Sequence, residues 1–462
     1  MVESKELERL RIMMRSITVD IMQLVKTRME IAQRIGAIKT NLNRKIEDEV
    51  VEQDIHNHVQ DLGSRIGLDR NFTGRLLNLL LTQSVKVQLE SSAFVDSLTP
   101  MDVFVRAKKL EKEGKKIIHL EVGEPDFLPP RRINHALLRA VEKGQVHYTE
   151  SSGVPALRKE LSKKFRCSDK ERVIVTPGAR FAIFSAIASV VNPGEEIIVF
   201  EPAWPAYRQC AEFIGAKVKV ISTSLANGWT PQMDQLEKVM SENTKMIVLN
   251  YPNNPTGKIV NGGLFRNIVD LARSKDVFVL SDEVYAEYSY LAFRSILEFG
   301  YEKGIMISSF SKSHAMTGFR VGFGISTEEI VEKMVKVQAM AVTSVAEPIQ
   351  YAALSALRNK VTGNIRIVKK RFELVRNRLE SMPVKYYCPD GGLYFFVQIS
   401  ELGIKPGLFL GYLLERGVAV APGIGFGRNY ADFIRISVCQ PIRMLNRGLD
   451  IIESSIRNPH MI

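Results

Sequence analysis

The first 40 residues carry apolar side chains at every third or fourth position. The repeating positions are Leu7, Leu10, Met14, Ile17, Ile21, Leu24, Val25, Ile31, Ile35 and Ile38. This spacing matches the helical repeat and predicts one very long helix over about residues 4–42. Two further helices are predicted at roughly 46–64 and 70–90. Because so long a helix cannot bury its apolar stripe against itself, we expect it to pack against a second copy of the chain.

The pattern changes after about residue 97 to short β-branched runs that alternate with helical segments and Gly/Pro turns. The runs are RVIVT, EEIIVF, KVKVI, KMIVLN, VFVLSD and GIMISS. This alternation predicts βαβ units and a mainly parallel sheet covered on both faces. It stops near residue 325, where a long helical stretch runs to about 382 and precedes strands such as LYFFVQI and FIRISVC. We therefore expect a smaller α+β subdomain after the sheet.

Composition divides the chain at the same place, because all 19 prolines and both tryptophans come after residue 92. A stretch without proline can form long uninterrupted helices. The predicted divisions are a helical domain at 1–92, a linker at 93–100 and a second domain at 101–462, with a large subdomain at about 135–325 and a small one at about 101–134 plus 326–462.

Charge and rare residues narrow the function classes. The net charge of +12 invites nucleic-acid binding, but basic residues are interleaved with acids, as in NRKIEDEVVEQD, so small anionic ligands explain them better. The four cysteines form no CxxC pair, as is typical of the cytoplasm, and the seven histidines show no metal-ligand spacing. The longest near-apolar stretch, Phe181 to Val191, is too short to span a membrane, and the charged N-terminal sequence MVESKELERL has no apolar signal-peptide core. We expect a cytoplasmic protein without a metal that binds neither nucleic acid nor membrane.

Polar side chains on the predicted helices of the first domain form a candidate anion site. Arg28 and Lys39 are 11 positions apart and therefore share a helix face, about 16 Å from each other. Arg11 lies 17 positions before Arg28, about 25 Å along the axis, and reaches the same ligand only from a second copy. Two i, i+4 pairs complete the set: Asp48 with Glu52 on the second helix, and Ser84 with Gln88 on the third.

This constellation resembles the all-helical chorismate mutases over about 80 residues. The resemblance implies that Arg28 and Ser84, with Arg11 of a second copy, hold the two carboxylates of chorismate. Lys39 and Gln88 would donate to the ether oxygen. The rearrangement needs no nucleophile, only a compact conformer and donors where negative charge grows.

The acidic pair has an implied role as well, because in that family the equivalents of Asp48 and Glu52 surround the hydroxyl-bearing region of the substrate. Val51 departs from the family, which often has arginine beside this pair, so one carboxylate contact lacks its usual donor. A second interpretation makes the helical domain a regulatory or dimerising module without turnover.

The second domain carries a series of motifs that surround a lysine. In chain order they are VGEPDF, HYTESSG, TPGAR, EPAWPAY, NNPTG, SDEVY, SFSK, APG and FIRIS. Asp282 sits at the carboxyl end of a predicted strand, where open α/β sheets bind ligands, and TPGAR opens an apolar helix whose free amides suit a phosphate. These motifs, in this order, are similar to the fold-type I aminotransferases that use pyridoxal 5′-phosphate (PLP), over about residues 97–460.

The resemblance implies a role for each residue around the cofactor ring. Lys312 would bond covalently to PLP and shuttle a proton, while Asp282 would pair with the pyridine nitrogen. Asn254 and Tyr285 would hydrogen-bond the phenolic oxygen. Trp204 would stack on the ring, and with Asn254 it would also border the substrate.

The phosphate and the substrate carboxylate have their own implied ligands. The implied phosphate ligands are Ser309, Arg320, the backbone of Gly178, Ala179 and Arg180, and Tyr148 from the neighbouring subunit. The family often has Gly-Gly-Lys or Gly-Gly-Thr where this chain has Gly-Ala-Arg, a change that keeps the amides and alters the side-chain contact. Arg435 would clamp the α-carboxylate of the substrate, which the Gly123 backbone would also approach.

Together the two resemblances imply a bifunctional enzyme of aromatic amino-acid biosynthesis, active as a homodimer or larger homo-oligomer. Its substrates would be chorismate, amino acids and 2-oxo acids. The alternative is an aspartate aminotransferase with a non-catalytic helical module; a transcription regulator is disfavoured, because its DNA-binding module would have short helices. The sequence leaves open whether aspartate or glutamate is the amino donor and whether prephenate or an aryl-pyruvate is the acceptor.

Overall fold

The computed structural model of the chain divides into two compact units, Met1–Leu98 and Thr99–Ile462. The structure describes residues 2–41, 49–70, 72–74, 76–77, 79–81, 83–84, 99–403 and 406–458. Within these residues no helix is long and apolar enough to cross a membrane.

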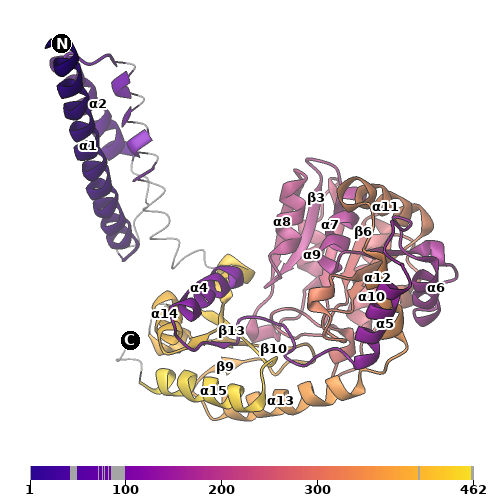
Figure 1. The fold of residues 1–462 in the computed structure, drawn as a ribbon. Helices are drawn as coiled ribbons and strands as arrows, with labels where there is room; N and C mark the ends of the chain where they lie inside the picture. Colours follow the sequence, from indigo (N-terminus) through magenta and orange to yellow (C-terminus); the bar gives the residue numbers. More distant parts are fainter. Residues whose placement is uncertain are drawn as a thin grey trace. The chain divides into compact units, whose positions relative to one another are not determined.

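The first unit is helical, as predicted. Helix α1 runs over Val2–Asn41 without a break, because no proline or interior turn signal interrupts it (Figure 1). Helix α2 covers Glu49–Arg65. The described residues between 70 and 84 are helical too, and the rest of the helix predicted to end near 90 lies outside the described residues.

Most of the apolar stripe on α1 stays exposed, although the first unit packs closely at Gly63. A Cβ on Gly63 would lie 2.7 Å from Thr73 Oγ1, so only glycine fits at that contact. The exposed apolar residues of α1 include Leu7, Leu10, Met14, Ile17, Ile21, Leu24, Ile31, Ile35 and Ile38. The stripe is therefore not buried within one chain.

The second unit is built on a seven-stranded sheet of order β2-β8-β7-β6-β5-β3-β4. The strands are β2 (Val173–Thr176), β3 (Glu196–Glu201), β4 (Lys217–Ser222), β5 (Thr244–Asn250), β6 (Phe278–Asp282), β7 (Gly304–Ser309) and β8 (Gly322–Ile325). Strands β3 to β7 are parallel, and only β8 runs antiparallel, against both of its neighbours. The predicted mainly parallel sheet is confirmed. Strand β8 was not among the predicted runs.

Helices cover both faces of this sheet (Figure 1). One face packs on α7 (Ala179–Val190), α8 (Ala206–Phe213) and α11 (Glu328–Val342), and the other on α5 (Arg131–Glu142), α6 (Pro155–Lys164), α10 (Gly262–Ser274) and α12 (Glu347–Leu357). Strand alternation explains this: Met246 and Val248 of β5 enter one core, whereas Ile247 and Leu249 enter the other. A shorter helix, α9 (Met233–Val239), lies near β4.

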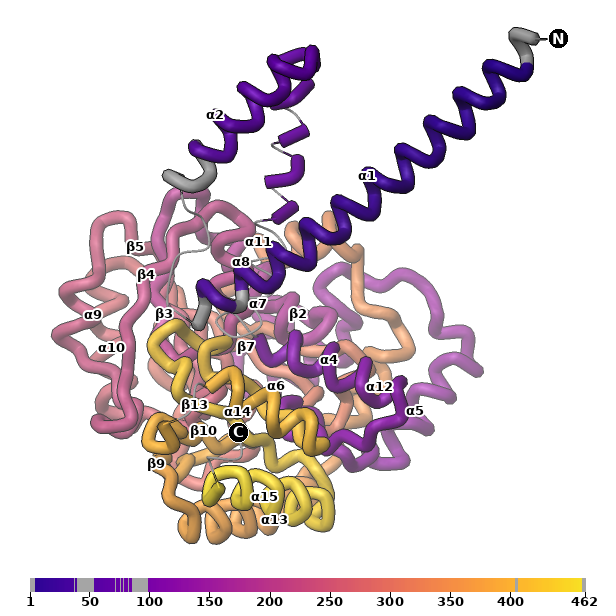
Figure 2. The backbone as a smooth tube through the Cα atoms, turned by 90° about the vertical axis from the view of Figure 1, so that its left-hand side faces the viewer, coloured from indigo at the N-terminus to yellow at the C-terminus, as the bar shows by residue number. Residues whose placement is uncertain are grey.

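A smaller sheet of order β12-β13-β10-β9 completes the unit. Its strands are β9 (Lys385–Tyr386), β10 (Tyr394–Gln398), β12 (Ala421–Pro422) and β13 (Phe433–Ser437). Helices α13 (Thr362–Glu380) and α15 (Ile442–Arg457) lie side by side against it (Figures 1 and 2). The helical stretch predicted to run to 382 is three helices. Helix α11 ends at Val342, before Thr343 with φ +61°, and Pro348 stands in the first turn of α12.

The first residues of the second unit, from Thr99 to Gly123, connect β11 (Val418–Ala419) with the carboxyl edge of the large sheet. Thr99 caps helix α4 (Pro100–Lys112), since its hydroxyl accepts from the Asp102 amide and the Asp102 carboxylate accepts from the Thr99 amide. Strand β1 (Ile118–His119) then pairs in parallel with β11, beside α14 (Pro406–Glu415). The chain passes from β1 directly to the carboxyl edge of the large sheet.

Candidate active site

A lysine lies at the carboxyl edge of the parallel strands. Strands β5, β6 and β7 end at Asn250, Asp282 and Ser309, and Lys312 follows three residues after β7. The Lys312 Nζ donates to the Gly123 carbonyl at 2.8 Å. Gly123 comes from the segment after β1, so two distant parts of the chain meet at this amine.

Asp282 is a buried carboxylate with two donors. The Tyr207 hydroxyl donates to its Oδ2 at 2.6 Å, and the Val284 amide donates to its Oδ1 at 3.2 Å. Burial raises the pKa of Asp282 to about 6, while the bond from Tyr207 lowers it. A carboxylate so placed can hold a positive ring nitrogen.

Aromatic rings extend from Asp282 to the start of α7. The Trp204 and Tyr207 rings pack edge to face with centroids 5.6 Å apart. The Arg180 guanidinium lies over the Trp204 ring, 4.7 Å from its centroid. Arg180, the residue at which this chain departs from the family's usual Lys or Thr, therefore contacts Trp204, the tryptophan predicted to stack on the cofactor.

Arg435 is a buried cation on β13. Its Nη1 donates to Asn254 Oδ1 at 2.8 Å and its Nη2 donates to the Glu121 carbonyl. Its guanidinium lies 4.1 Å from the Tyr394 ring centroid and 4.9 Å from that of Phe426. Among the described residues its buried Nε has no hydrogen-bond partner. Such a group is ready to bind a carboxylate.

Tyr285 joins the same cluster through its hydroxyl. Its Oη is 2.9 Å from the Tyr394 Oη, and burial raises the pKa of Tyr285 well above its usual value. A Cβ on Gly123 would lie 1.7 Å from the Tyr394 Oη, so no other residue fits there. The structure thus brings Tyr285, Asn254, Arg435 and Gly123 together.

The start of α7 forms an anion cradle. Gly178 precedes the helix with φ +84°, and a Cβ there would lie 2.7 Å from Arg320 Nη2. A Cβ on Gly322 would lie 2.6 Å from the Ala179 amide nitrogen. Free helix amides beside a guanidinium favour a phosphate, and Ser309 ends the strand next to β8.

These groups fit the chemistry of PLP. The cradle suits the phosphate, Asp282 suits the ring nitrogen, and Lys312 supplies an amine. Tyr148 is the exception within one chain, because its side chain is 89% exposed and does not pack against the other predicted ligands.

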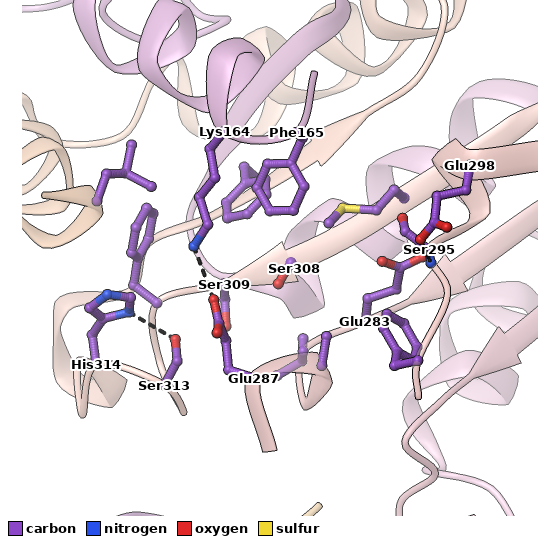
Figure 3. A pocket seen from close by; sticks show the side chains of 17 residues that line it. Lys164, Phe165, Glu283, Glu287, Ser295, Glu298, Ser308, Ser309, Ser313 and His314 are labelled. Carbon is purple, nitrogen blue, oxygen red and sulfur yellow. Dashed lines mark hydrogen bonds and ion pairs between the residues drawn. The ribbon is translucent and has the colours of Figure 1, made fainter. Parts of the chain in front are cut away.

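A cavity of about 240 Å³ borders the segment between Ser308 and His314, which contains Lys312 (Figure 3). Ser309 and Ser313 contribute to its wall, but neither Lys312 nor Asp282 does. Lys164 points across it to Glu287, at 3.0 Å. Glu283 also lines the cavity, and burial raises the pKa of Glu283 to about 7. The cavity adjoins the candidate active site without being part of it.

In the helical unit, the structure describes only some of the residues predicted to form the mutase site. Arg28 has a buried Nε without a partner among the described residues, whereas the exposed Arg11 pairs with Glu8 at 3.6 Å. Ser84 is buried and donates to the Leu80 carbonyl at 2.8 Å.

The other predicted mutase residues are less completely placed. Lys39 lies half-buried in the last turn of α1. Asp48 and Gln88 lie outside the described residues, and Glu52 belongs to α2 with its side chain outside them.

Sequence reasoning missed three residues of the aminotransferase site: Tyr207, Tyr394 and Glu121. Tyr207 stands in the EPAWPAY motif, three residues after Trp204, and that spacing on a helix start was a usable signal. Tyr394 lies in a predicted strand, but its facing toward Arg435 depends on the tertiary fold. Glu121 acts through its backbone, which leaves no signal in the sequence.

Two family models match the chain: "Aminotransferase class I and II" over residues 115–452 and "Chorismate mutase type II" over residues 10–89. An aspartate aminotransferase of Thermotoga maritima is 34% identical, over 78% of this chain and 96% of its own length. The aromatic-amino-acid aminotransferase 2 of Thermococcus litoralis is 31% identical, over 75% of this chain and 93% of its own.

A solved structure is similar as well. The crystal structure of the Thermotoga maritima aspartate aminotransferase superposes with a TM-score of 0.74 at 33% identity, over 78% of this chain and 98% of that one.

Proposed function

Because this chain belongs to the class I and II aminotransferases and carries a type II chorismate mutase domain, we propose that it rearranges chorismate to prephenate and transaminates a 2-oxo acid. The class I and II aminotransferases depend on PLP. The two domains together make the chain a transferase joined to an isomerase. The acceptor we propose is prephenate or an aryl-pyruvate, with aspartate or glutamate as donor, since prephenate already carries a 2-oxo acid group. This places the enzyme in aromatic amino-acid biosynthesis.

The observation that carries the transaminase assignment is that Lys312 and Arg435 are held by carbonyls only two residues apart. Lys312 Nζ donates to Gly123, and Arg435 Nη2 donates to Glu121. A substrate between them would present its α-carbon to the amine and its carboxylate to the guanidinium. The unpartnered Nε of Arg435 supports this assignment.

When bound, PLP supplies an electron-withdrawing ring that stabilises negative charge on the α-carbon. Asp282, fixed by Tyr207, would hold the ring nitrogen. Lys312 Nζ would take the proton from the α-carbon and deliver it to the cofactor carbon that carries the nitrogen. The Trp204 ring would stack on the cofactor.

Other groups hold the ends of the cofactor and substrate. The Gly178–Arg180 amides, Ser309 and Arg320 would hold the phosphate, joined by Tyr148 of a second copy. Asn254 and Tyr285 would contact the phenolic oxygen. The high exposure of Tyr148 supports a role across a subunit boundary.

For the mutase, we assign the carboxylates of chorismate to Arg28, Ser84 and the Arg11 of a second copy. The buried, unpartnered Nε of Arg28 supports this assignment. Lys39 and Gln88 donate to the ether oxygen, where negative charge grows as the C–O bond breaks, and Asp48 and Glu52 border the hydroxyl.

The exposed apolar stripe of α1 supports a homodimer. All four cysteines are unpaired in the structure, which supports a cytoplasmic location.

The test is a pair of assays on the purified protein loaded with PLP. Chorismate consumption measures the mutase, and a panel of aspartate and glutamate against prephenate, phenylpyruvate and 2-oxoglutarate measures the transaminase. Turnover of prephenate with either donor supports the full proposal. Binding of chorismate without turnover would instead make the helical domain regulatory.

A further inference from the structure

His119, at the end of β1, lies between two carboxylates. Its Nδ1 is 2.6 Å from Glu121 Oε1 and its Nε2 is 3.1 Å from Glu111 Oε1. A neutral imidazole has one N–H and donates to only one of these oxygens, whereas the doubly protonated ring donates to both. The hydrogen bond that His119 donates to Glu121, and to a smaller extent the one to Glu111, raises the pKa of His119 despite its partial burial.

The elements packed around His119 supply these charges. Helix α4 brings Glu111, whose other oxygen pairs with Lys108 at 2.8 Å, and the Phe104 ring, 5.9 Å from the imidazole by centroids. Strand β11 pairs with β1 through apolar residues, and α15 presents Gly448 to Ile118. The charged groups that face the ring are therefore the two glutamates, with Lys108 behind one of them.

The backbone beside His119 leads straight into the active site. The Glu121 side chain is fully buried, and its backbone carbonyl accepts from Arg435. The Gly123 carbonyl, two residues on, accepts from Lys312. On the side that faces β11, the Leu120 amide donates to the Ala419 carbonyl at 2.9 Å. Side chains anchor this segment at three residues: at His119 through its pair of bonds, at Glu124, which accepts from Thr317, and at Asp126, which accepts from Arg371. The bonds at His119 are the ones that hold the Glu121 side chain itself.

We propose that His119 is a positioning residue for substrate binding: by donating to both Glu111 and Glu121, it fixes the Glu121 carbonyl that holds Arg435. This inference rests on the assignment of Arg435 to the substrate carboxylate. When His119 loses its second proton, one of the two bonds is lost and the Glu121 side chain is held less firmly. The Michaelis constant (KM) for the amino acid then rises with pH, while kcat changes less, because Lys312 and Asp282 keep their contacts.

The experiment measures kcat and KM of the holoenzyme across pH with aspartate or glutamate, whichever is turned over faster. His119→Gln, which donates to only one glutamate, should raise KM about 10-fold near neutral pH and change kcat by less than about 2-fold. His119→Lys, a cation with three N–H groups, should restore KM and keep it low at the pH where the wild-type value rises. His135→Gln, at an exposed position of α5, is the matched control and should change neither constant.

Two further variants separate the possible failures. A folded His119→Gln enzyme with wild-type KM at every pH, or a His135→Gln enzyme with the same loss, would overturn the positioning role. Arg435→Lys identifies the deeper failure: an unchanged KM in that variant would overturn the carboxylate assignment itself. If His119→Gln does not fold, Glu111→Gln tests the same idea, because the Glu111 side chain is 32% exposed and tolerates the change. In that variant the rise of KM with pH should begin at a lower pH than in the wild type. An unchanged pH profile of KM would contradict the proposal.

Discussion

The Tyr207 hydroxyl donates to the Asp282 carboxylate at 2.6 Å, deep in the second unit. Both groups are buried, so the bond is shielded from water. Burial alone favours the neutral form of Asp282, and the donor opposes that effect. Tyr207 therefore helps keep the acid charged, in the state that binds a protonated ring nitrogen.

Tyr207→Phe should weaken PLP binding and lower transaminase kcat, each by roughly 10-fold, because a hydrogen bond to a charged group contributes about 1.5–3 kcal/mol. Absorbance titration of the apoenzyme with PLP measures the first effect and initial rates measure the second. Tyr301→Phe is the matched control, since Tyr301 also donates to a buried acceptor, the Val277 carbonyl at 2.7 Å. Equal losses in both variants would show a general stability effect.

Lys312→Ala should abolish transamination and the visible absorbance of the covalently bound cofactor. The mutase rate should stay nearly intact, because the two sites lie in separate units. Lys333→Ala, at an exposed ion pair with Glu329, serves as the control. Normal transaminase turnover in Lys312→Ala would show that this lysine is not the reacting amine.

Glu283 should make the second unit less stable as pH rises. Burial raises the pKa of Glu283 from 4.5 to about 7, so the folded state binds a proton that the unfolded state releases. Its contribution is complete below about pH 4.5 and is lost as pH rises toward 7. Glu283→Gln keeps an acceptor for the Ile296 amide and removes the titration, so its free energy of unfolding should fall less with pH than that of the wild type.

Denaturant unfolding at about pH 5 and pH 8 measures this difference. Both tryptophans, Trp204 and Trp229, belong to the second unit, so their fluorescence reports that unit alone. Asp282 titrates in the same direction but is present in both proteins, and therefore cancels. Parallel pH dependences in the variant and the wild type would contradict the role of Glu283.

The elements were predictable where a local pattern determines them. The unbroken apolar repeat of α1 and the six β-branched runs needed no tertiary information. Strand β8 escaped because it is only four residues long and half glycine, so it carries little β-propensity of its own. Strand β8 forms because its backbone pairs with β2 on one side and β7 on the other.

The site was predictable where side chains recur in motifs, as for Lys312 and Asp282. It was not predictable where backbone atoms or packing act. Gly123, in the segment after β1, meets Tyr394 on β10 only in the folded chain, and no local pattern states that a Cβ on Gly123 would meet that ring. The position of Arg180 over Trp204 depends in the same way on how α7 meets the β3 loop.

Lys39→Ala and Gln88→Ala should each lower the mutase kcat about 10²-fold or more, as is typical for a donor aimed at developing charge. Arg28→Ala should mainly raise KM for chorismate, because its contact to a carboxylate exists before the rearrangement begins. Lys26→Ala is the control, since its side chain is 78% exposed on the same helix. A kcat loss confined to Arg28→Ala would reverse these assignments.

At a chorismate concentration far below the raised KM, mixing Arg11→Ala with Arg28→Ala should restore mutase activity that neither variant has alone. Arg11 and Arg28 lie about 25 Å apart along one rigid helix and cannot share a ligand within a chain. An Arg11→Ala subunit keeps its own Arg28, and an Arg28→Ala subunit keeps its own Arg11. A mixed dimer therefore contains one intact composite site and one that lacks both arginines. With free exchange, half of the dimers are mixed, so about one quarter of wild-type activity should return.

The measurement is chorismate consumption after the two variants are mixed and allowed to exchange, with differently tagged subunits to verify that mixed dimers form. Each variant alone should show almost no activity at that low chorismate concentration. A mixture of Arg28→Ala with Lys39→Ala is the matched negative control, because both residues belong to the same chain's half of the site. Confirmed exchange without recovered activity, or an active monomer, would contradict the composite site. If Arg28→Ala regains activity when mixed with Arg11→Ala but not when mixed with Lys39→Ala, Arg11 acts in the site of the other subunit. The dimer that this requires would explain why α1 leaves its apolar stripe exposed in a single chain.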